Sequence, residues 1–188
     1  MQPDHPRHRR RSIRLSGYDC AQAGAYFLTV CTARHRPLFG AVRDGRMVLS
    51  HFGMIAAAEW RRTGRLRVGT KAGLCVVMPN HLHGVLLLTA DRDGQVAHPS
   101  RSEAFGKPMS RSVPTIVRAF KAAVTRRINA ARDTPGAPVW QRDYYEHVIR
   151  DEDELGRVYD YIMANPAQWE FDRENPEHGA PLTPGPFQ

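Results

Sequence analysis

Residues 76–88, VVMPNHLHGVLLL, place two histidines one residue apart inside an otherwise apolar run. Side chains alternate faces along a strand, so His81 and His83 project from the same face with Cα atoms roughly 6.6 Å apart. Leu82, Gly84, Leu86 and Leu88 take the other face. Two imidazoles at this separation can share one cation, or hydrogen bonds alone can satisfy them. The stretch therefore predicts a buried strand that carries either a metal pair or a hydrogen-bonded polar pair.

Hydrophobic patterns on both sides of this stretch predict a domain of mixed helices and strands. Strands are predicted at residues 25–33, at 46–50 after the Asp44-Gly45 turn, at 72–79 and 81–89, and across 139–150. Helices are predicted at 51–64 behind a Ser50 cap, at 112–132 behind Ser112 with Pro114 in the first turn, and at 151–165 with an acidic first turn. The polar residues from 90 to about 110 are predicted to form a loop.

Length and composition favour one domain that binds a polyanion. The 188 residues include 27 Lys and Arg against 19 Asp and Glu, a net charge of +8. Nucleic acid is the first candidate partner and a membrane surface the second. No apolar run approaches the roughly 20 residues of a spanning helix, and the N-terminus has no apolar signal core. We expect a cytoplasmic protein that does not enter a membrane.

The chain divides into three predicted parts. Residues 1–14 form a basic arm, residues 15–170 a single domain, and residues 171–188 an irregular tail rich in Pro and Gly. Cys20, Cys31 and Cys75 are scattered and contain no CxxC pair. They therefore predict ordinary reduced thiols rather than a disulfide framework or a cysteine zinc knuckle.

The last predicted helix carries a candidate reactive group. Tyr161 and Asn165 are four residues apart and share a helix face beside the apolar stripe. A phenol is a reasonable nucleophile toward phosphate, and an amide oxygen suits a hard cation such as Mg²⁺ or Mn²⁺. Spacing alone leaves the tyrosine open, and the competing residues are Tyr144, Tyr145 and Tyr159.

Three ordered motifs carry a family resemblance. MPNHLHG, the downstream WQRDYYEHVIR and the later YDYIMANPAQW together resemble the REP-associated tyrosine transposases, a branch of the single-tyrosine HUH transposases. The resemblance covers roughly residues 14–169. It implies an α+β fold of the ferredoxin-like, RNA-recognition type, with a central antiparallel sheet and helices packed mainly on one side.

The resemblance also implies roles for individual residues. His81 and His83 match the metal pair, Tyr161 matches the catalytic tyrosine, and Asn165 occupies the place of a third metal ligand. The implied cofactor is Mg²⁺ or Mn²⁺. The implied reaction is nicking and rejoining of hairpin-flanked single-stranded DNA through a 5′-phosphotyrosine, by a monomer or a homodimer.

Contacts to DNA are predicted from charge and aromatic character. The candidate residues are Arg118, Lys121, Arg126, Trp140, Tyr144 and Tyr145. His147 is a candidate proton shuttle, for which a structural hydrogen bond is the alternative. A different function, that of a DNA-binding protein that keeps the fold without the chemistry, fits the same basic composition. A zinc hydrolase using the two histidines lacks a matching motif such as HExxH.

Overall fold

The computed structural model describes residues 22–89 and 112–176. Its strands are β1 (Gly24–Cys31), β2 (Gly40–Arg43), β3 (Arg46–Leu49), β4 (Thr70–Val77), β5 (His81–Leu88) and β6 (Tyr145–Ile149). Its helices are α1 (His51–Thr63), α2 (Val113–Ala131) and α3 (Glu152–Ala164), with short 3₁₀ turns η1 (Ala33–His35) and η2 (Trp169–Phe171). The predicted N-terminal arm, the predicted loop from residue 90 to 110 and residues 177–188 of the predicted tail lie outside the described residues.

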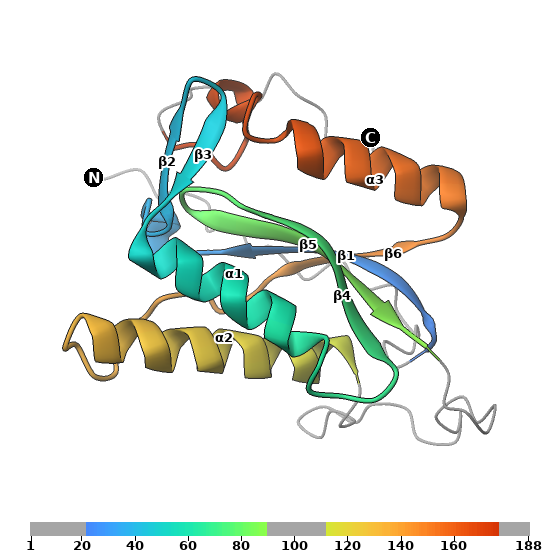
Figure 1. Ribbon diagram of the computed structural model, residues 1–188, viewed down its shortest axis with the longest axis horizontal. Coiled ribbons are helices and arrows are strands. Elements are labelled where there is room, and N and C mark those ends of the chain that lie inside the picture. The colour runs from blue at the N-terminus through green and yellow to red at the C-terminus, as the bar shows by residue number, and fades with distance from the viewer. Residues whose placement is uncertain (1–21, 90–111, 177–188) are drawn as a thin grey trace, which may run out of the picture.

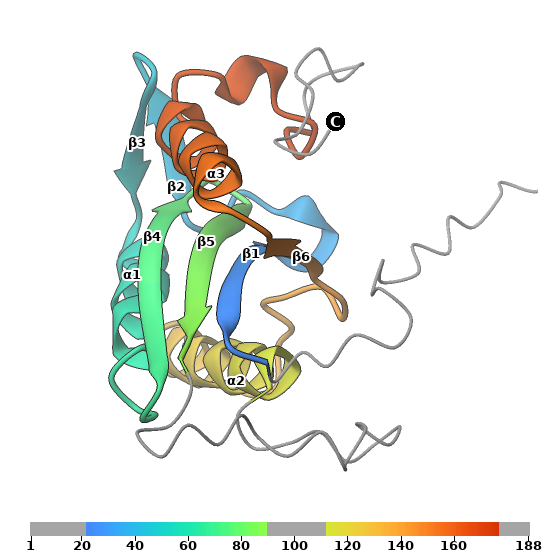
Figure 2. The ribbon, with the colours of Figure 1, turned by 90° about the vertical axis from the view of Figure 1, so that its right-hand side faces the viewer.

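Four strands form the central antiparallel sheet in the order β4, β5, β1, β6 (Figure 2). Strand β1 lies inside the sheet and pairs with both β5 and β6. Its register against β5 sets Cys31 opposite His81 and Thr29 opposite His83. Because paired residues in an antiparallel ladder share a face, these four side chains lie on the same side of the sheet.

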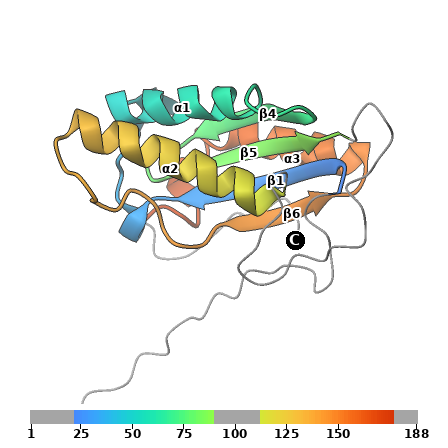
Figure 3. The same cartoon turned by 90° about the horizontal axis from the view of Figure 1, so that it is seen from below.

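Helices cover both faces of this sheet (Figure 1). The layer of α1 and α2 lies on one face, where their apolar side chains pack against Tyr26, Leu28 and Leu86. Figure 3, seen from below, shows the two helices side by side in front of the strands. Helix α3 lies on the opposite face and packs through Val158 and Ile162 against Phe27 and Val85. The predicted α+β fold class is confirmed, with two of the three helices on one side.

A glycine beside the histidine pair makes room for the largest core side chain. A Cβ built on Gly84 would lie 2.4 Å from Cζ2 of Trp60, an α1 residue that is 2% exposed. The indole therefore packs directly against the β5 backbone on the face opposite the histidines. Helix α1 begins as predicted, because the Ser50 side chain accepts a hydrogen bond from the Gly53 amide at 3.1 Å.

The structure differs from the predicted elements in two places. Strand β2 was not predicted, because its four residues, GAVR, carry too short a pattern to separate a strand from a turn. The predicted strand at 139–150 is wrong for residues 139–144, since only Tyr145–Ile149 joins the ladder. Trp140 instead forms an isolated bridge with Thr32, and its ring packs between Phe39 and Phe120.

The segment after α3 lies near the turn between β2 and β3 and near the end of β1. Helix α3 ends where predicted, before Asn165 and Pro166, and η2 follows it. The turn between β2 and β3 reaches this region, because a Cβ on Gly45 would lie 3.6 Å from Cα of Ala167. Asp172 beyond η2 is buried. Within residues 22–89 and 112–176, the structure contains no helix long and apolar enough to cross a membrane.

Candidate active site

The two histidines lie together on the α3 face of the sheet, as their spacing predicts. Their ring centroids are 4.4 Å apart, and both side chains are almost completely buried. The ring of Phe27, on the neighbouring strand β1, stacks against His83 with centroids 5.3 Å apart. The pair is thus held in a fixed, largely water-free environment beside an aromatic side chain.

A neighbouring side chain fixes one nitrogen of each imidazole. Nδ1 of His81 lies 2.9 Å from Oδ1 of Asn80, an acceptor, so Nδ1 carries the proton. Nδ1 of His83 lies 2.8 Å from the Thr29 hydroxyl, which can accept its proton in the same way. In this tautomer both Nε2 atoms keep a lone pair, which is the usual arrangement for histidines that bind metals.

Burial keeps both imidazoles neutral at physiological pH. It lowers the pKa of His81, although the negative charges of Asp172 and Glu174 oppose the shift. It lowers the pKa of His83 further, and the neighbouring His81 adds to this effect. Neutral imidazoles are the form that can ligate a cation.

Helix α3 brings Tyr161 to the pair. Asp151 caps the helix by accepting a hydrogen bond from the Glu154 amide at 2.7 Å, and the apolar stripe turns the Tyr161 flank toward the sheet. The Tyr161 hydroxyl lies 3.4 Å from Nε2 of His83, and its ring meets Phe27 edge to face. Burial, with Asp172 and Glu174 nearby, raises the pKa of Tyr161 above its ordinary value, so the phenol is protonated.

Asn165 and Asp172 supply oxygen atoms beside the histidines. The Asn165 amide donates a hydrogen bond to Oδ2 of Asp172 at 3.1 Å, and this oxygen lies 3.9 Å from Nε2 of His81. Among the residues that the structure describes, buried side-chain atoms without a hydrogen-bond partner include Nε2 of His81 and Oδ1 of Asn165. Buried polar atoms of this kind call for a partner.

The donor set fits a divalent cation. Ligand atoms of His81, His83 and Asp172 all lie within 4.8 Å of one another. Two neutral imidazoles with a carboxylate, and the Asn165 amide oxygen close by, are a mixed nitrogen and oxygen set that Mn²⁺ or Mg²⁺ accepts. A bound cation would account for the buried Nε2 of His81, which has no hydrogen-bond partner among the described residues.

The predicted DNA contacts on α2 lie in the helical layer on the other side of the sheet (Figure 1). Arg118 and Arg126 are exposed there. Lys121 is not, because its ammonium donates hydrogen bonds of 3.0, 3.2 and 2.9 Å to the carbonyl groups of residues 141–143. Burial lowers the pKa of Lys121 to about 8. This lysine fastens a loop to α2.

The predicted aromatic contacts occupy two different surroundings. Trp140 packs in the α1 and α2 layer, and its indole donates to the Lys121 carbonyl at 3.2 Å. Tyr144 packs against the same layer and donates to Glu146 at 2.8 Å. Tyr145 lies on the α3 face, edge to face with Phe27, and is 38% exposed.

His147 lies in β6 on the α3 face, and its side chain contacts the first turn of α3. Its Nε2 is 2.9 Å from Oε1 of Glu154. Glu154 precedes Tyr161 by about two helical turns. The hydrogen bond that the structure gives His147 therefore fixes β6 to the first turn of α3.

Sequence reasoning missed Asp172, together with its neighbours His35 and Glu174. His35 lies in η1, and the two acidic residues follow η2, where no periodic pattern assigns a side chain to a face. One available signal was the pair of acidic residues in DRENP, shortly after the helix that carries Tyr161.

Comparison with known proteins was made by sequence and by structure. No protein-family model matches the chain. A Haemophilus influenzae protein described as uncharacterized is 37% identical over 169 residues, which span 88% of this chain and 93% of the relative. The two proteins belong to one family. This kinship with the Haemophilus relative extends across the histidine strand and α3.

The structural comparison identifies the fold. A REP-associated tyrosine transposase, solved bound to a REP hairpin, superposes with a TM-score of 0.50 at 18% sequence identity. The match covers 81% of this chain and 72% of the transposase chain. The chain and its Haemophilus relative therefore belong to a family with the fold of that transposase, which confirms the predicted resemblance at the level of the fold.

Proposed function

We propose that this chain is a cation-dependent DNA transposase that nicks and rejoins hairpin-containing single strands through a phosphotyrosine intermediate. The observation that carries the proposal is the Tyr161 hydroxyl, 3.4 Å from Nε2 of a buried histidine in a site with unsatisfied polar atoms. The fold shared with a REP-associated tyrosine transposase supports it. The net charge of +8 suits a DNA substrate.

The cation is assigned to the nitrogen and oxygen atoms on the α3 face. His81, His83 and Asp172 would hold it, with the Asn165 amide oxygen as a further ligand. Mg²⁺ or Mn²⁺ is the expected ion. When bound, it supplies positive charge that stabilises the nonbridging oxygens of the scissile phosphate and favours the phenolate form of Tyr161.

Tyr161 is the nucleophile in this proposal. Its oxygen forms a bond to phosphorus, the bond from phosphorus to the 3′-oxygen breaks, and that oxygen leaves as a 3′-hydroxyl. The proton of the phenol is released to solvent or to the leaving oxygen. The 5′-phosphate remains on Tyr161, and attack by another 3′-hydroxyl on this phosphotyrosine joins two strands and restores the phenol.

Tyr145 is the aromatic residue best situated to touch a substrate base. It is half-exposed on the site face and meets Phe27, which also contacts Tyr161. A base stacked on its ring would lie beside the nucleophile. Arg118 and Arg126 are proposed to contact phosphates farther from the site, since both belong to the exposed side of α2.

A covalent adduct assay tests the proposal. The full chain is incubated with Mn²⁺ and a labelled pool of single-stranded oligonucleotides, each with one hairpin and short randomised flanks. We expect a DNA-protein species that survives denaturation, with the DNA on Tyr161 by mass spectrometry. Tyr161→Phe should abolish the adduct while leaving binding nearly unchanged, because only the hydroxyl is removed.

Tyr159→Phe is the matched control. Tyr159 lies on the same helix and packs in the apolar cluster on the α3 face, so its variant should form the adduct normally. If the Tyr161→Phe variant still forms the adduct, the nucleophile is a different residue. DNA binding without any adduct in the wild-type chain, with Mn²⁺ and with Mg²⁺, would favour a DNA-binding protein that lacks the chemistry.

A further inference from the structure

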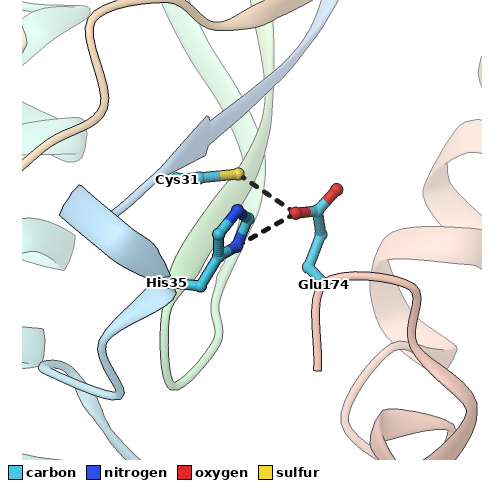
Figure 4. Close-up of side chains that lie close together, drawn as sticks. All are labelled: Cys31, His35 and Glu174. Carbon is cyan, nitrogen blue, oxygen red and sulfur yellow. Dashed lines mark hydrogen bonds and ion pairs between the residues drawn. The ribbon is translucent and has the colours of Figure 1, made fainter. Parts of the chain in front are cut away.

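A second group of metal-ligating side chains lies at the end of β1, beside the candidate active site. Cys31 ends the strand, His35 lies in η1 and Glu174 follows η2 (Figure 4). Oε2 of Glu174 lies 3.6 Å from Sγ of Cys31 and 3.3 Å from Nδ1 of His35. The side chains of Cys31 and His35 both point toward Glu174, which comes from a segment far away in the sequence.

We propose that Cys31, His35 and Glu174 bind a zinc ion. In a tetrahedral site with bonds of about 2.3 Å to sulfur and about 2.0 Å to nitrogen and oxygen, sulfur and oxygen lie about 3.5 Å apart. By the same geometry nitrogen and oxygen lie about 3.3 Å apart. The observed separations of 3.6 and 3.3 Å match both values. Both separations from the Glu174 oxygen therefore suit tetrahedral zinc, and all three ligand atoms lie within 4.8 Å of one another.

Thiolate chemistry separates this ion from the one proposed at the histidine pair. A thiolate with one imidazole and one carboxylate selects zinc over Mg²⁺ or Mn²⁺, which favour oxygen-rich sets. On binding, the Cys31 thiol loses its proton to solvent and the zinc-sulfur bond forms. No redox change is involved. With three protein ligands, the fourth position is completed by a water molecule.

The backbone holds His35 ready for this role. Arg34 and His35 have φ angles of 58° and 52°, a left-handed conformation that is uncommon outside glycine. This bend turns the His35 ring toward Glu174. Nε2 of the Gln141 amide lies 2.6 Å from Nε2 of His35 and donates a hydrogen bond to it, so that without zinc Nδ1 carries the ring proton. Nδ1 faces Oε2 of Glu174 at 3.3 Å, and binding of zinc at Nδ1 would shift the ring proton to Nε2 and turn the Gln141 amide so that its oxygen accepts that proton.

Asn80 forms hydrogen bonds to both sets of candidate metal ligands. Its side-chain amide donates to the Glu174 carbonyl at 2.6 Å and to the His35 carbonyl at 3.4 Å, while its oxygen accepts from His81. The Glu174 amide in turn donates to Asp172 at 2.7 Å. A zinc ion on Glu174 would fasten the segment that carries Asp172 to the end of the sheet. Its role is therefore structural support of the neighbouring site.

Cobalt spectroscopy of the full chain tests the proposal under reducing conditions. Bound Co²⁺ coordinated by a thiolate gives an intense near-ultraviolet charge-transfer band, which nitrogen and oxygen ligands do not give. We expect the band in the wild-type chain, its displacement by zinc, and its loss in Cys31→Ser. Cys20→Ser and Cys75→Ser are matched thiol controls and should keep the band.

The paired variant His81→Ala with His83→Ala distinguishes the two metal groups. It removes the proposed catalytic cation and should retain the charge-transfer band. Loss of the band in this variant, its persistence in Cys31→Ser, or its absence from the wild-type chain would each overturn the proposal. The DNA adduct assay tests the proposed function separately. Absence of an adduct would count against the role of Tyr161 and would leave the charge-transfer band of the zinc site unaffected.

A second measurement does not depend on variant folding. Zinc should slow alkylation of Cys31 in the wild-type chain at least tenfold, as read at that residue by mass spectrometry, because a bound thiolate is a poor nucleophile. Glu174→Gln should weaken zinc binding by about 10-fold to 100-fold. Alkylation of Cys31 at the same rate with and without zinc would contradict the site.

Discussion

Replacing Asp172 with asparagine tests which oxygen atom completes the cation site at the histidine pair. Oδ2 of Asp172 lies 3.9 Å from Nε2 of His81 and accepts a hydrogen bond from Asn165 at 3.1 Å. The asparagine has the same shape, and its amide oxygen can accept that bond. Because the carboxylate also accepts the Glu174 amide at 2.7 Å, the substitution removes one negative charge and one of two hydrogen-bond acceptors while keeping the side-chain volume.

The size of the effect follows from the attraction between the Asp172 carboxylate and the bound cation, taken at a separation of about 4 Å and for one unit of cation charge. Two unit charges about 4 Å apart interact with about 4 kcal/mol at an effective dielectric constant of about 20. Asp172 is 6% exposed, so solvent screens little of this interaction. Allowing for rearrangement, a loss of about 3 kcal/mol corresponds to roughly hundredfold weaker binding. Titration of the full chain with Mn²⁺, followed by calorimetry, measures the change in Kd.

Glu170→Gln is the matched control, since it changes the net charge equally at an exposed position on η2. It should leave Mn²⁺ affinity nearly unchanged. Wild-type affinity in Asp172→Asn would refute the assignment of this carboxylate as a ligand. A large loss in Asn165→Ala under the same conditions would then assign the oxygen ligand to the helix end.

Two further predictions concern stability. Gly84→Ala should lower the free energy of unfolding by about 2 kcal/mol in urea titrations, because the added methyl would overlap the Trp60 ring. Glu154→Gln should cost about 1.5 kcal/mol at neutral pH, because Glu154 accepts a hydrogen bond from the Arg150 amide and shares one with His147. Burial raises the pKa of Glu154, but these bonds outweigh burial and hold it below its ordinary value. The Glu154 carboxylate therefore stabilises the fold at pH values above its ordinary pKa. The difference in unfolding free energy between wild type and Glu154→Gln should disappear as the pH falls below about 4.

Each stability prediction has a control on α3. Gly156 has open space around it, so Gly156→Ala should stabilise the helix by up to about 1 kcal/mol, the opposite sign from the substitution in β5. Glu152→Gln removes an exposed charge from the same first turn and should have a smaller effect than Glu154→Gln. Equal effects within either pair would contradict the packing and hydrogen bonds described above.

Periodic segments allowed most of the fold to be predicted from the sequence. Helices α1, α2 and α3 and strands β1, β4 and β5 carry long apolar patterns, and the period decides their faces. The alternation around His81 was sufficient to separate the imidazoles from Leu82, which packs on the opposite side. Residues 139–144 were assigned wrongly because partly buried aromatic residues in a loop imitate the alternation of a strand.

The candidate site was predictable only where it lies on regular elements. Strand spacing predicts His81 and His83 as a pair, whereas the family resemblance was needed to choose Tyr161 among the tyrosines, and the structure brings this phenol to the pair. Asp172 reaches the site from an irregular segment, whose path depends on tertiary hydrogen bonds such as that from Asn165. No local pattern encodes such a path.

The thickness of the sheet between α2 and α3 sets a minimum length for any nucleic acid that contacts both helices. Layers of secondary structure pack roughly 10 Å apart, so α2 and α3 are separated by roughly 20 Å. At about 3.4 Å per base step, this thickness corresponds to roughly six steps of a stacked strand. A substrate that is cut at Tyr161 and also contacts Arg118 would therefore have to pass around an edge of the sheet. Oligonucleotides shorter than about six nucleotides could reach only one of these two residues.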